Sequence, residues 1–408
     1  MVLDESARIA EALLTIEASV DAAALSERTR QLESIRGGLG YTAVALAETD
    51  DLVDTRIEDK TPVITPESLN GALPLTRASA ETTRDSRQAI GDILTRQADR
   101  LLVIAGPCSI HDPEAALNYA ETLSRWRDGY GDSLEIIMRC YPEKPRTERG
   151  WKGFIYDPLL DESDDINVGI VATRLLTSQI TSMGVPLAME RLNALTPQYV
   201  NGMVAYDAIG ARTTTDQKAR EYASGTSSAV GFKNTPEGSI EAAVQAVVSA
   251  SGPHSFLGMS LNGTPSQIRT SGNEQAHIIL RGSNSGPNYT SDNVTEAKRA
   301  LREKGLRESI GIDASHGNSH KKADKQLEVV ADVSEQIAGG EGAIVMVMIE
   351  GNLIGGAQKL RRPDGSLKQS KELVYGQSIT DECASLTQTE AMLAALQEAV
   401  QRRRNRLQ

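Results

Sequence analysis

The chain has 408 residues, of which 43 are Lys or Arg and 55 are Asp or Glu, so its formal net charge is −12. This acidic balance argues against a nucleic-acid or membrane-surface binder, because such binding surfaces are basic. Three cysteines are too few for a disulfide framework and fit a reducing compartment. The chain has no apolar run of about 18 residues and no signal-like N-terminus, so we expect a cytoplasmic protein with neither a membrane nor a nucleic-acid partner.

The first hundred residues form the first predicted unit. Apolar residues recur at helical spacing at Ile9, Leu13 and Ile16, and a further helix is expected from about residue 80 to 96. No convergent cluster of polar side chains suggests catalysis in this part. We therefore interpret residues 1–100 as a helical N-terminal arm for oligomerisation or regulation, in a homodimer or a homotetramer.

From residue 101 onward, short apolar runs alternate with amphipathic stretches of helical period. Strands are predicted at Leu101–Ala105, Leu134–Met138, Val185–Met189, Asp207–Gly210, Ala229–Phe232, His277–Leu280, Ser309–Ile312 and Ala343–Ile349. Helices are expected at Asn167–Met183, Ile240–Ser251, Val294–Lys304, Gln326–Ala338 and Glu390–Arg404. Eight such units over residues 101–408 favour an α/β fold of the (β/α)8 TIM-barrel type. A doubly wound open sheet competes, but the chain lacks its Gly-rich dinucleotide turn.

Two loops are too long to be plain connections between barrel elements. The first runs from Gly252 to Ala276 and contains Asn262-Gly263 between short alternating segments, which is a hairpin signal. The second runs from Asn352 to Thr380 and contains the turn Arg362-Pro-Asp-Gly365. We therefore predict two inserted β-hairpin loops in the barrel domain.

Polar side chains follow every predicted strand, and in a barrel of this type the C-terminal strand ends form the active site. Four of these side chains are cations, and two more cations follow the second strand; the set is Arg139, Lys144, Arg146, Arg212, Lys233 and Arg281. Any one of them could pair with a surface carboxylate. All of them at one mouth predict substrates that carry several phosphate or carboxylate charges.

A second set of strand-end residues consists of Cys108, His316, Glu350 and a later carboxylate such as Asp381. A thiolate, an imidazole and carboxylates together suit a borderline divalent ion. A lone Cys is more often a small buried hydrophobe, and a lone His more often satisfies hydrogen bonds. The first, seventh and eighth strands are neighbours in a closed barrel, which favours a metal site.

Ten segments occur in one order from about residue 70 to the C-terminus: Gly106–Pro113, Glu143–Thr147, Gly150–Gly153, Thr196–Tyr199, Ile209–Thr214, Gly231–Asn234, Ile279–Gly282, Ser315–Ser319, Ile349–Glu350 and Ser378–Asp381. As a set they resemble the type I 3-deoxy-D-arabino-heptulosonate 7-phosphate (DAHP) synthases. The resemblance implies a (β/α)8 fold and a metal-dependent aldol-type condensation. Phosphoenolpyruvate (PEP) and erythrose 4-phosphate become DAHP and phosphate, in the first step of the shikimate pathway to aromatic amino acids.

The resemblance also implies roles for individual residues. PEP is expected at Arg139, Glu190, Ala211, Arg212, Lys233 and Arg281, and erythrose 4-phosphate at Lys144, Pro145, Arg146, Thr147 and Asp381. The implied metal ligands are Cys108, His316, Glu350 and Asp381. The catalytic set is Lys233, Arg139, Cys108 and His316, with Lys233 as a general acid. One divalent ion is expected, with Mn²⁺ first and Co²⁺, Fe²⁺ or Zn²⁺ as alternatives.

Regulation is a further expectation from the resemblance. Many family members are inhibited by an aromatic amino acid that binds away from the catalytic mouth, in a cavity that matches Pro197, Gln198, Ser227 and Gly258 here. Gly258 falls where Tyr-sensitive members have Gly and Phe-sensitive ones have Ser. If an effector acts on this chain, tyrosine is therefore expected before phenylalanine; the alternatives are an unregulated enzyme and one that a protein partner controls. A glycine that merely serves a strand bend is the plainer interpretation.

Besides an N-terminal part about 50 residues longer than is usual in the family, three departures from the family pattern leave alternatives open. They are Pro142, shortly before the segment Lys144–Thr147 that we call the sugar loop, Arg191–Asn193 after the third strand, and Thr235–Glu237 after the fifth. One alternative is the same chemistry with another aldose phosphate, in secondary metabolism. Another is a non-catalytic regulatory paralogue. The Lys-Pro-Arg-Thr sequence at Lys144–Thr147 favours the four-carbon sugar, since octulosonate synthases usually carry Lys-Ala-Asn-Arg.

Overall fold

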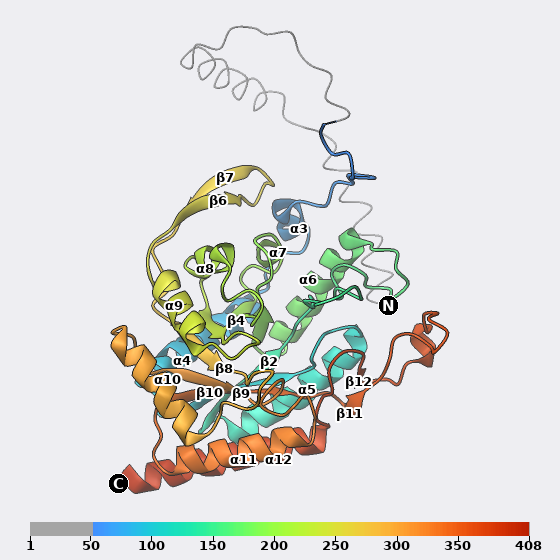
Figure 1. The fold of residues 1–408 in the computed structure, drawn as a ribbon. Coiled ribbons are helices and arrows are strands. Elements are labelled where there is room, and N and C mark those ends of the chain that lie inside the picture. Colours follow the sequence, from blue (N-terminus) through green and yellow to red (C-terminus); the bar gives the residue numbers. More distant parts are fainter. Residues whose placement is uncertain (1–51, 408) are drawn as a thin grey trace, which may run out of the picture.

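The computed structural model describes residues 52–407, and its centre is a closed barrel of parallel strands (Figure 1). The strands follow the order β1-β10-β9-β8-β5-β4-β3-β2 around the barrel, so its first and last strands in the chain are neighbours. They are β1 (Leu101–Gly106), β2 (Leu134–Arg139), β3 (Leu187–Glu190), β4 (Val204–Ile209), β5 (Ala229–Lys233), β8 (Ala276–Leu280), β9 (Ile310–Asp313) and β10 (Ile344–Glu350). The predicted (β/α)8 fold is confirmed.

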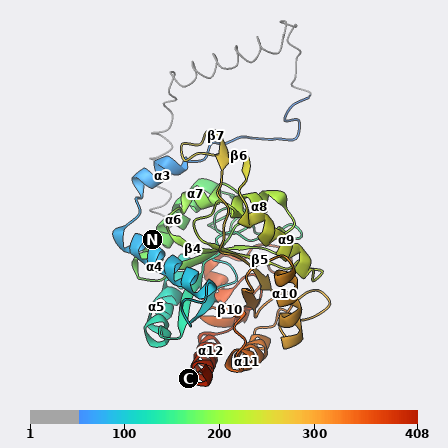
Figure 2. The same ribbon diagram turned by 90° about the vertical axis from the view of Figure 1, so that its left-hand side faces the viewer.

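Helices surround the barrel between successive strands (Figure 2). They are α5 (Pro113–Tyr130), α6 (Ile166–Ser182), α7 (Thr196–Tyr199), α8 (Gln217–Ala223), α9 (Ile240–Ser251), α10 (Ser291–Glu303), α11 (Lys325–Ala338) and α12 (Leu386–Leu407). Local sequence sets their starts: the Asp112 carboxylate caps α5, and Pro113 occupies a position whose N–H needs no partner. Among the helices of the described chain, none is both long and apolar enough to cross a membrane.

The barrel strands are buried on both faces, so alternate residues serve two apolar layers. Val103 packs outward in the layer between strands and helices, whereas Leu102 and Ile104 belong to the barrel interior. The helix α4 (Arg77–Leu94) adds Ile90 and Leu94 to the interior layer. It therefore packs over the N-terminal ends of the strands and leaves their C-terminal ends for the site.

The predicted N-terminal arm lies only partly within the described residues. Its expected last helix is α4, and the short helix α3 (Pro66–Ala72) precedes it. The backbone N–H of Glu67 donates to the carbonyl of Leu261 at 2.8 Å, which ties α3 to an inserted loop of the barrel. The periodic segment at Ile9–Ile16 lies outside the described residues, and the role of residues 1–100 in oligomerisation or regulation stays a prediction.

The two long loops have different structures. The first is the predicted hairpin, with β6 (Ser255–Met259) antiparallel to β7 (Pro265–Arg269). The second contains β11 (Ile354–Ala357) and β12 (Gln377–Ser378), which pair in parallel, so the prediction of a hairpin is wrong at its base. Only its tip is hairpin-like, where an antiparallel bridge joins Arg361 to Leu367. Parallel pairing needs a crossover of about a dozen residues, and the projecting segment 358–376 provides it (Figure 1).

Candidate active site

A cavity of about 350 Å³ opens where the barrel strands end. Residues at or just after the C-terminal ends of β2, β3, β4, β5, β8 and β9 all contribute to its lining. The predicted site residues among them are Arg139, Lys144, Pro145, Arg146, Thr147, Glu190, Ala211, Arg212, Lys233, Arg281, His316 and Asp381. The structure therefore brings both predicted substrate sets around one cavity, which we call the catalytic mouth. The substrate that each residue contacts stays a prediction.

Arg139 is the most constrained cation of the mouth. Its side chain is 1% exposed and lies 2.9 Å from Glu350 Oε1. Its Nε and Nη2 donate to the carbonyls of Pro107 and Cys108, each at 3.2 Å. Its guanidinium carbon lies 3.6 Å above the centre of the Tyr141 ring. These contacts fix the guanidinium plane before any anion binds.

Lys233 and His316 share one buried carboxylate, that of Asp313. Asp313 Oδ2 accepts from Lys233 Nζ at 2.8 Å and lies 2.9 Å from His316 Nδ1. Its Oδ1 accepts from the Ser315 hydroxyl at 2.6 Å. Burial alone would raise the pKa of Asp313, but the adjacent His316 and Lys233 hold that pKa well below its usual range. Sequence reasoning gave Asp313 no role, because only the fold brings it to Lys233.

The backbone of His316 is strained. Its φ of 57° lies in the left-handed region, which non-glycine residues rarely adopt. Such a conformation costs about 1–3 kcal/mol and persists where surrounding contacts impose it. Here the backbone N–H of Lys321 donates to the His316 carbonyl at 2.7 Å. The strain turns the imidazole toward Asp313 and Glu350, whose Oε1 lies 3.6 Å from His316 Nε2.

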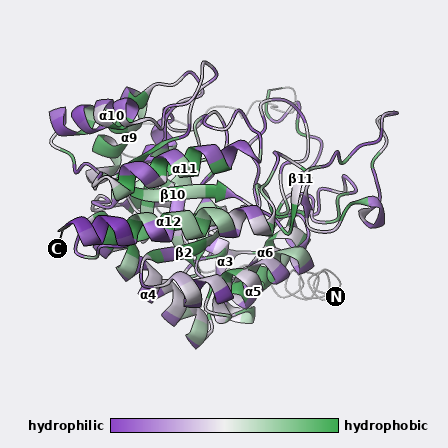
Figure 3. Ribbon diagram, turned by 90° about the horizontal axis from the view of Figure 1, so that it is seen from below, coloured by the Kyte–Doolittle hydropathy of each residue, from purple (hydrophilic) through white to green (hydrophobic). Residues whose placement is uncertain are grey.

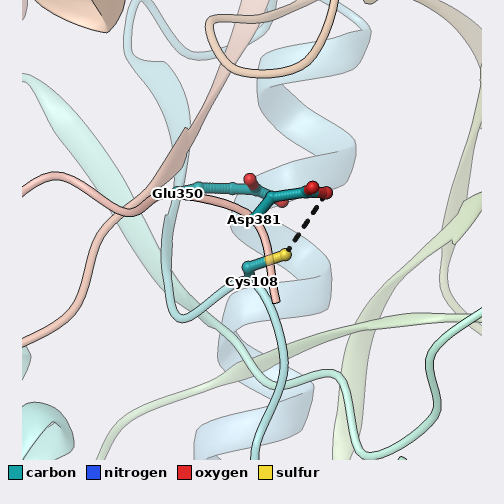
Figure 4. A group of neighbouring side chains, drawn as sticks. All are labelled: Cys108, Glu350 and Asp381. Carbon is teal, nitrogen blue, oxygen red and sulfur yellow. Dashed lines mark hydrogen bonds between the residues drawn. The ribbon is translucent and has the colours of Figure 1, made fainter. Parts of the chain in front are cut away.

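Three of the four predicted metal ligands form one compact group (Figure 4). Ligand atoms of Cys108, Glu350 and Asp381 all lie within 4.8 Å of one another, and His316 lies beside the group. Cys108 Sγ and Asp381 Oδ2 are 3.8 Å apart. Lys144 Nζ donates to Cys108 Sγ at 2.8 Å and lies 3.6 Å from Asp381 Oδ2. The sulfur and carboxylate oxygens of this group therefore lie close enough together to bind one cation.

Two observations show that these residues fit a metal ion. Glu350 Oε1 is buried and accepts no hydrogen bond from the described part of the chain, although the Arg139 guanidinium lies close to it. Burial, with the Glu350 charge next, raises the pKa of the Cys108 thiol, so the thiolate needs a nearby cation. A buried carboxylate oxygen that accepts no hydrogen bond from the described residues, a thiol and a second carboxylate match the ligand preferences of a borderline divalent ion.

The sugar-loop segment contains a residue that sequence reasoning missed. Glu143 is 3% exposed, and its Oε1 accepts from Asn193 Nδ2 at 2.7 Å and from the Tyr156 hydroxyl at 3.0 Å. Burial raises its pKa to about 7. Through its hydrogen bond with Asn193, Glu143 thus links the start of the sugar loop to the segment after β3. Arg146, in the same loop, remains exposed at the catalytic mouth.

The predicted effector residues lie together on the other side of the segment that follows β3. Gln198, Ser227 and Gly258 line a cavity of about 420 Å³ between α8 and the β6–β7 hairpin. Pro197 lines an adjoining cavity of about 180 Å³, together with Gln198 and Ser227. A Cβ on Gly258 would lie 2.6 Å from Ile268 Cγ1, so this glycine makes room for the opposite strand.

The departures from the family pattern fall in two places. Pro142 and Arg191 line the 180 Å³ cavity behind the sugar loop, away from the catalytic mouth. Arg191 also lines the effector cavity and forms an ion pair with Asp207 at 3.3 Å. Pro236 does line the mouth. The departure after β5 is therefore the one that reaches the space where substrates would bind.

Comparisons with known proteins agree with this geometry. Residues 73–394 match the model of the DAHP synthetase I family. The Phe-sensitive phospho-2-dehydro-3-deoxyheptonate aldolase of Escherichia coli K12 is 46% identical over 86% of this chain and 98% of its own length. The Tyr-sensitive enzyme of the same strain is 41% identical over 86% of this chain and 97% of its own. The structure of the Francisella tularensis enzyme is 44% identical, covers 85% of this chain and 99% of its own, and superposes with a TM-score of 0.82. The chain therefore belongs to the DAHP synthetase I family.

Proposed function

We propose that the chain condenses PEP with erythrose 4-phosphate and water to give DAHP and inorganic phosphate. The observation that carries the proposal is that the cation set lines one cavity together with His316 and Asp381, and that Asp381 belongs to the compact Cys108–Glu350–Asp381 group. The two substrates bring two phosphates and one carboxylate, which the arginine and lysine side chains suit. The aldolase names of the relatives support the same reaction.

In this proposal the two substrates take separate parts of the mouth. PEP lies at Arg139, Glu190, Ala211, Arg212, Lys233 and Arg281, and the aldose phosphate lies at Lys144, Pro145, Arg146, Thr147 and Asp381. The PEP methylene carbon attacks the aldehyde carbon, water adds to the former enol carbon, and phosphate leaves by C–O cleavage. Lys233 Nζ, oriented by Asp313, holds the proton that a general acid delivers.

We propose further that Cys108, His316, Glu350 and Asp381 hold one divalent ion, Mn²⁺ before Co²⁺, Fe²⁺ or Zn²⁺. When bound, such an ion supplies Lewis-acid polarisation of the aldehyde oxygen. The protein's part is to orient its ligands: Asp313 faces Nδ1 of His316 and leaves Nε2 toward Glu350. Arg139 links this group to the PEP side through its ion pair with Glu350.

Phosphate release tests the reaction directly. Purified enzyme is given PEP with erythrose 4-phosphate, and phosphate is measured before EDTA, after EDTA and after each metal is restored. Release that needs both substrates, stops with EDTA and returns best with Mn²⁺ supports the proposal. Arabinose 5-phosphate and ribose 5-phosphate form the second arm, because Pro236 borders the mouth. Faster turnover with a five-carbon sugar would reassign the aldose substrate.

We propose that the effector cavity binds tyrosine. Support comes from Gln198, Ser227 and Gly258 lining one cavity, next to Pro197. Tyr222 and Phe256 stack edge to face with ring centres 5.2 Å apart on its wall, a surface that suits an aromatic ring. Arg191 and Arg269 also line it and suit a carboxylate.

A further inference from the structure

A second large cavity lies at the opposite end of the barrel, where β1 and β10 begin. Its volume is about 500 Å³. Ile93, Ile344 and Val345 contribute apolar surface, and four arginines border it: Arg96, Arg100, Arg403 and Arg406. This composition, an apolar floor with guanidinium groups around it, differs from that of the catalytic mouth, where charged side chains predominate. We call it the basal cavity.

Two of the four arginines that border the basal cavity, Arg96 and Arg406, have no carboxylate partner among the described residues. Asp99 is the one acidic residue among the described residues that line it, and it is shared by Arg403 and Arg404. Arg96 Nη2 and Arg406 Nη1 donate to backbone carbonyls, those of Glu308 at 2.9 Å and Gly339 at 3.0 Å. A carbonyl orients a guanidinium but leaves its charge in place.

The other carboxylates nearby are engaged elsewhere. Arg100 is paired with Glu135 at 2.8 Å, the Glu308 carboxylate with Arg302 at 2.8 Å, and Glu335 with Arg402 at 2.6 Å. Arg403 is 8% exposed, and its Nε has no hydrogen-bond partner in the described part of the chain. The Nε of Arg100 is likewise without a partner among the described residues, so two buried donors of the cluster are unsatisfied.

The partial negative charges at nearby helix C-termini offset only part of this positive charge. The helices α4, α11 and α12 all end at the basal cavity, and the last turns of α12 are strongly hydrophilic (Figure 3). Each helix C-terminus carries about half a negative charge, which gives about −1.5 for three. The four bordering arginines and the adjacent Arg404 carry five positive charges, and Asp99 and Glu135 neutralise two of them, so three remain. The excess therefore stays positive.

We propose that the basal cavity binds a small organic carboxylate with an apolar body. The carboxylate faces Arg403 and Arg406, and the body lies on Ile93, Ile344 and Val345. The volume lies within the range of small-molecule sites, about 300–1,000 Å³. Planar guanidinium groups bind carboxylates in a defined orientation, whereas the apolar floor excludes a bare inorganic anion as the preferred ligand.

The glycines of the wall provide a way to fill the cavity. A Cβ built on Gly342 meets no atom within 4 Å, and this residue is not among the glycines with positive φ. Gly342→Leu therefore places a side chain in the cavity without backbone strain. Gly129 in α5 is a matched control, since its Cβ also meets nothing within 4 Å and it does not line the cavity.

Calorimetric titration with 3-phenylpropionate tests the proposal, in saturating PEP so that the catalytic mouth is blocked. We expect binding by the wild type and by Gly129→Leu, and at least about tenfold weaker binding by Gly342→Leu and by Arg406→Gln, which removes one charge-assisted contact. The uncharged 3-phenylpropanol and inorganic phosphate should both bind more weakly than the acid.

Four results would overturn the proposal. Unchanged binding in Gly342→Leu would place the ligand elsewhere. Equal affinity for the alcohol, or higher affinity for phosphate, would reject the ligand class. No binding of the acid, with a lower melting temperature in Arg406→Gln, would show that the arginines only stabilise helix ends.

Discussion

Lys233 and Asp313 form a buried ion pair beneath the catalytic mouth, with Nζ 2.8 Å from Oδ2, although 80 residues separate them in the chain. The same carboxylate oxygen lies 2.9 Å from His316 Nδ1. One oxygen atom therefore joins the proposed general acid to a proposed metal ligand. Asp313 can act on both without touching substrate.

The first prediction concerns that carboxylate. Asp313→Asn should lower kcat by about 10–100-fold, the usual cost of losing a group that orients a metal ligand. It should also weaken metal retention, measured by plasma mass spectrometry after dialysis. Asp128→Asn, an exposed change in α5, is the control. A folded Asp313→Asn enzyme with wild-type kcat and metal content would show that the pair is only structural.

The second prediction separates the metal group from the PEP site. Cys108→Ala should abolish metal-dependent turnover, a loss of more than about 100-fold, while PEP binding by calorimetry is largely kept. Cys140→Ala is a matched control, because Cys140 is equally buried but lies outside the group. That control should lose only stability. Near-wild-type turnover in Cys108→Ala would reject the metal assignment.

The third prediction concerns the sugar loop. Arg146→Ala should raise KM for erythrose 4-phosphate far more than KM for PEP, because one charge-assisted contact is worth about 1.5–3 kcal/mol. Steady-state kinetics with each substrate varied in turn measures the split. Arg149→Ala changes an exposed arginine of the same loop that does not line the mouth. Equal effects on both substrates would mean that Lys144–Thr147 does not separate the two sites.

The fourth prediction is a pH dependence of stability. Burial raises the pKa of Glu143 from its ordinary value of 4.5 to about 7, so the folded state binds the proton more tightly than the unfolded state. The buried carboxyl is therefore tolerated best when it is protonated. Its contribution to the free energy of unfolding falls as the pH rises from about 4.5 to 7. The free energy of unfolding that depends on Glu143 differs by about 3 kcal/mol between the two ends of this pH range, at 1.36 kcal/mol per pKa unit.

Urea unfolding at pH 5 and pH 8 checks this sign. Glu143→Gln should gain stability relative to the wild type at pH 8 and much less at pH 5. Glu148→Gln, at an exposed position of the same loop, should show no such difference. A Gln variant that is no more stable than the wild type at pH 8 would mean that Glu143 is not buried as described.

The barrel was predictable from sequence because its strands are buried on both faces and appear as continuous apolar runs. Agreement was poorest at β4, which starts at Val204 and not at Asp207, since Asp207 lies inside the strand and is paired with Arg191. The parallel pairing of β11 and β12 was missed because turn signals report only local geometry. Asp313 and Glu143 were missed for a related reason. Their roles depend on partners that only the closed barrel or the folded loop brings near.

The last prediction concerns the effector cavity. Tyrosine should bind more tightly than phenylalanine or tryptophan in calorimetric titrations, because the polar side chains of Gln198 and Ser227 line the cavity and can satisfy a buried phenol hydroxyl. Gly258→Ser should weaken tyrosine binding, since a new Cβ would lie 2.6 Å from Ile268 Cγ1 and force Ile268 to move. Gly252→Ser is the control: its Cβ meets its nearest atom at an ordinary 3.6 Å and lies outside the cavity. Phenylalanine binding most tightly, or no binding by any aromatic amino acid, would reject tyrosine as the effector. Tyrosine binding that is unaffected in Gly258→Ser would place the effector in a different cavity.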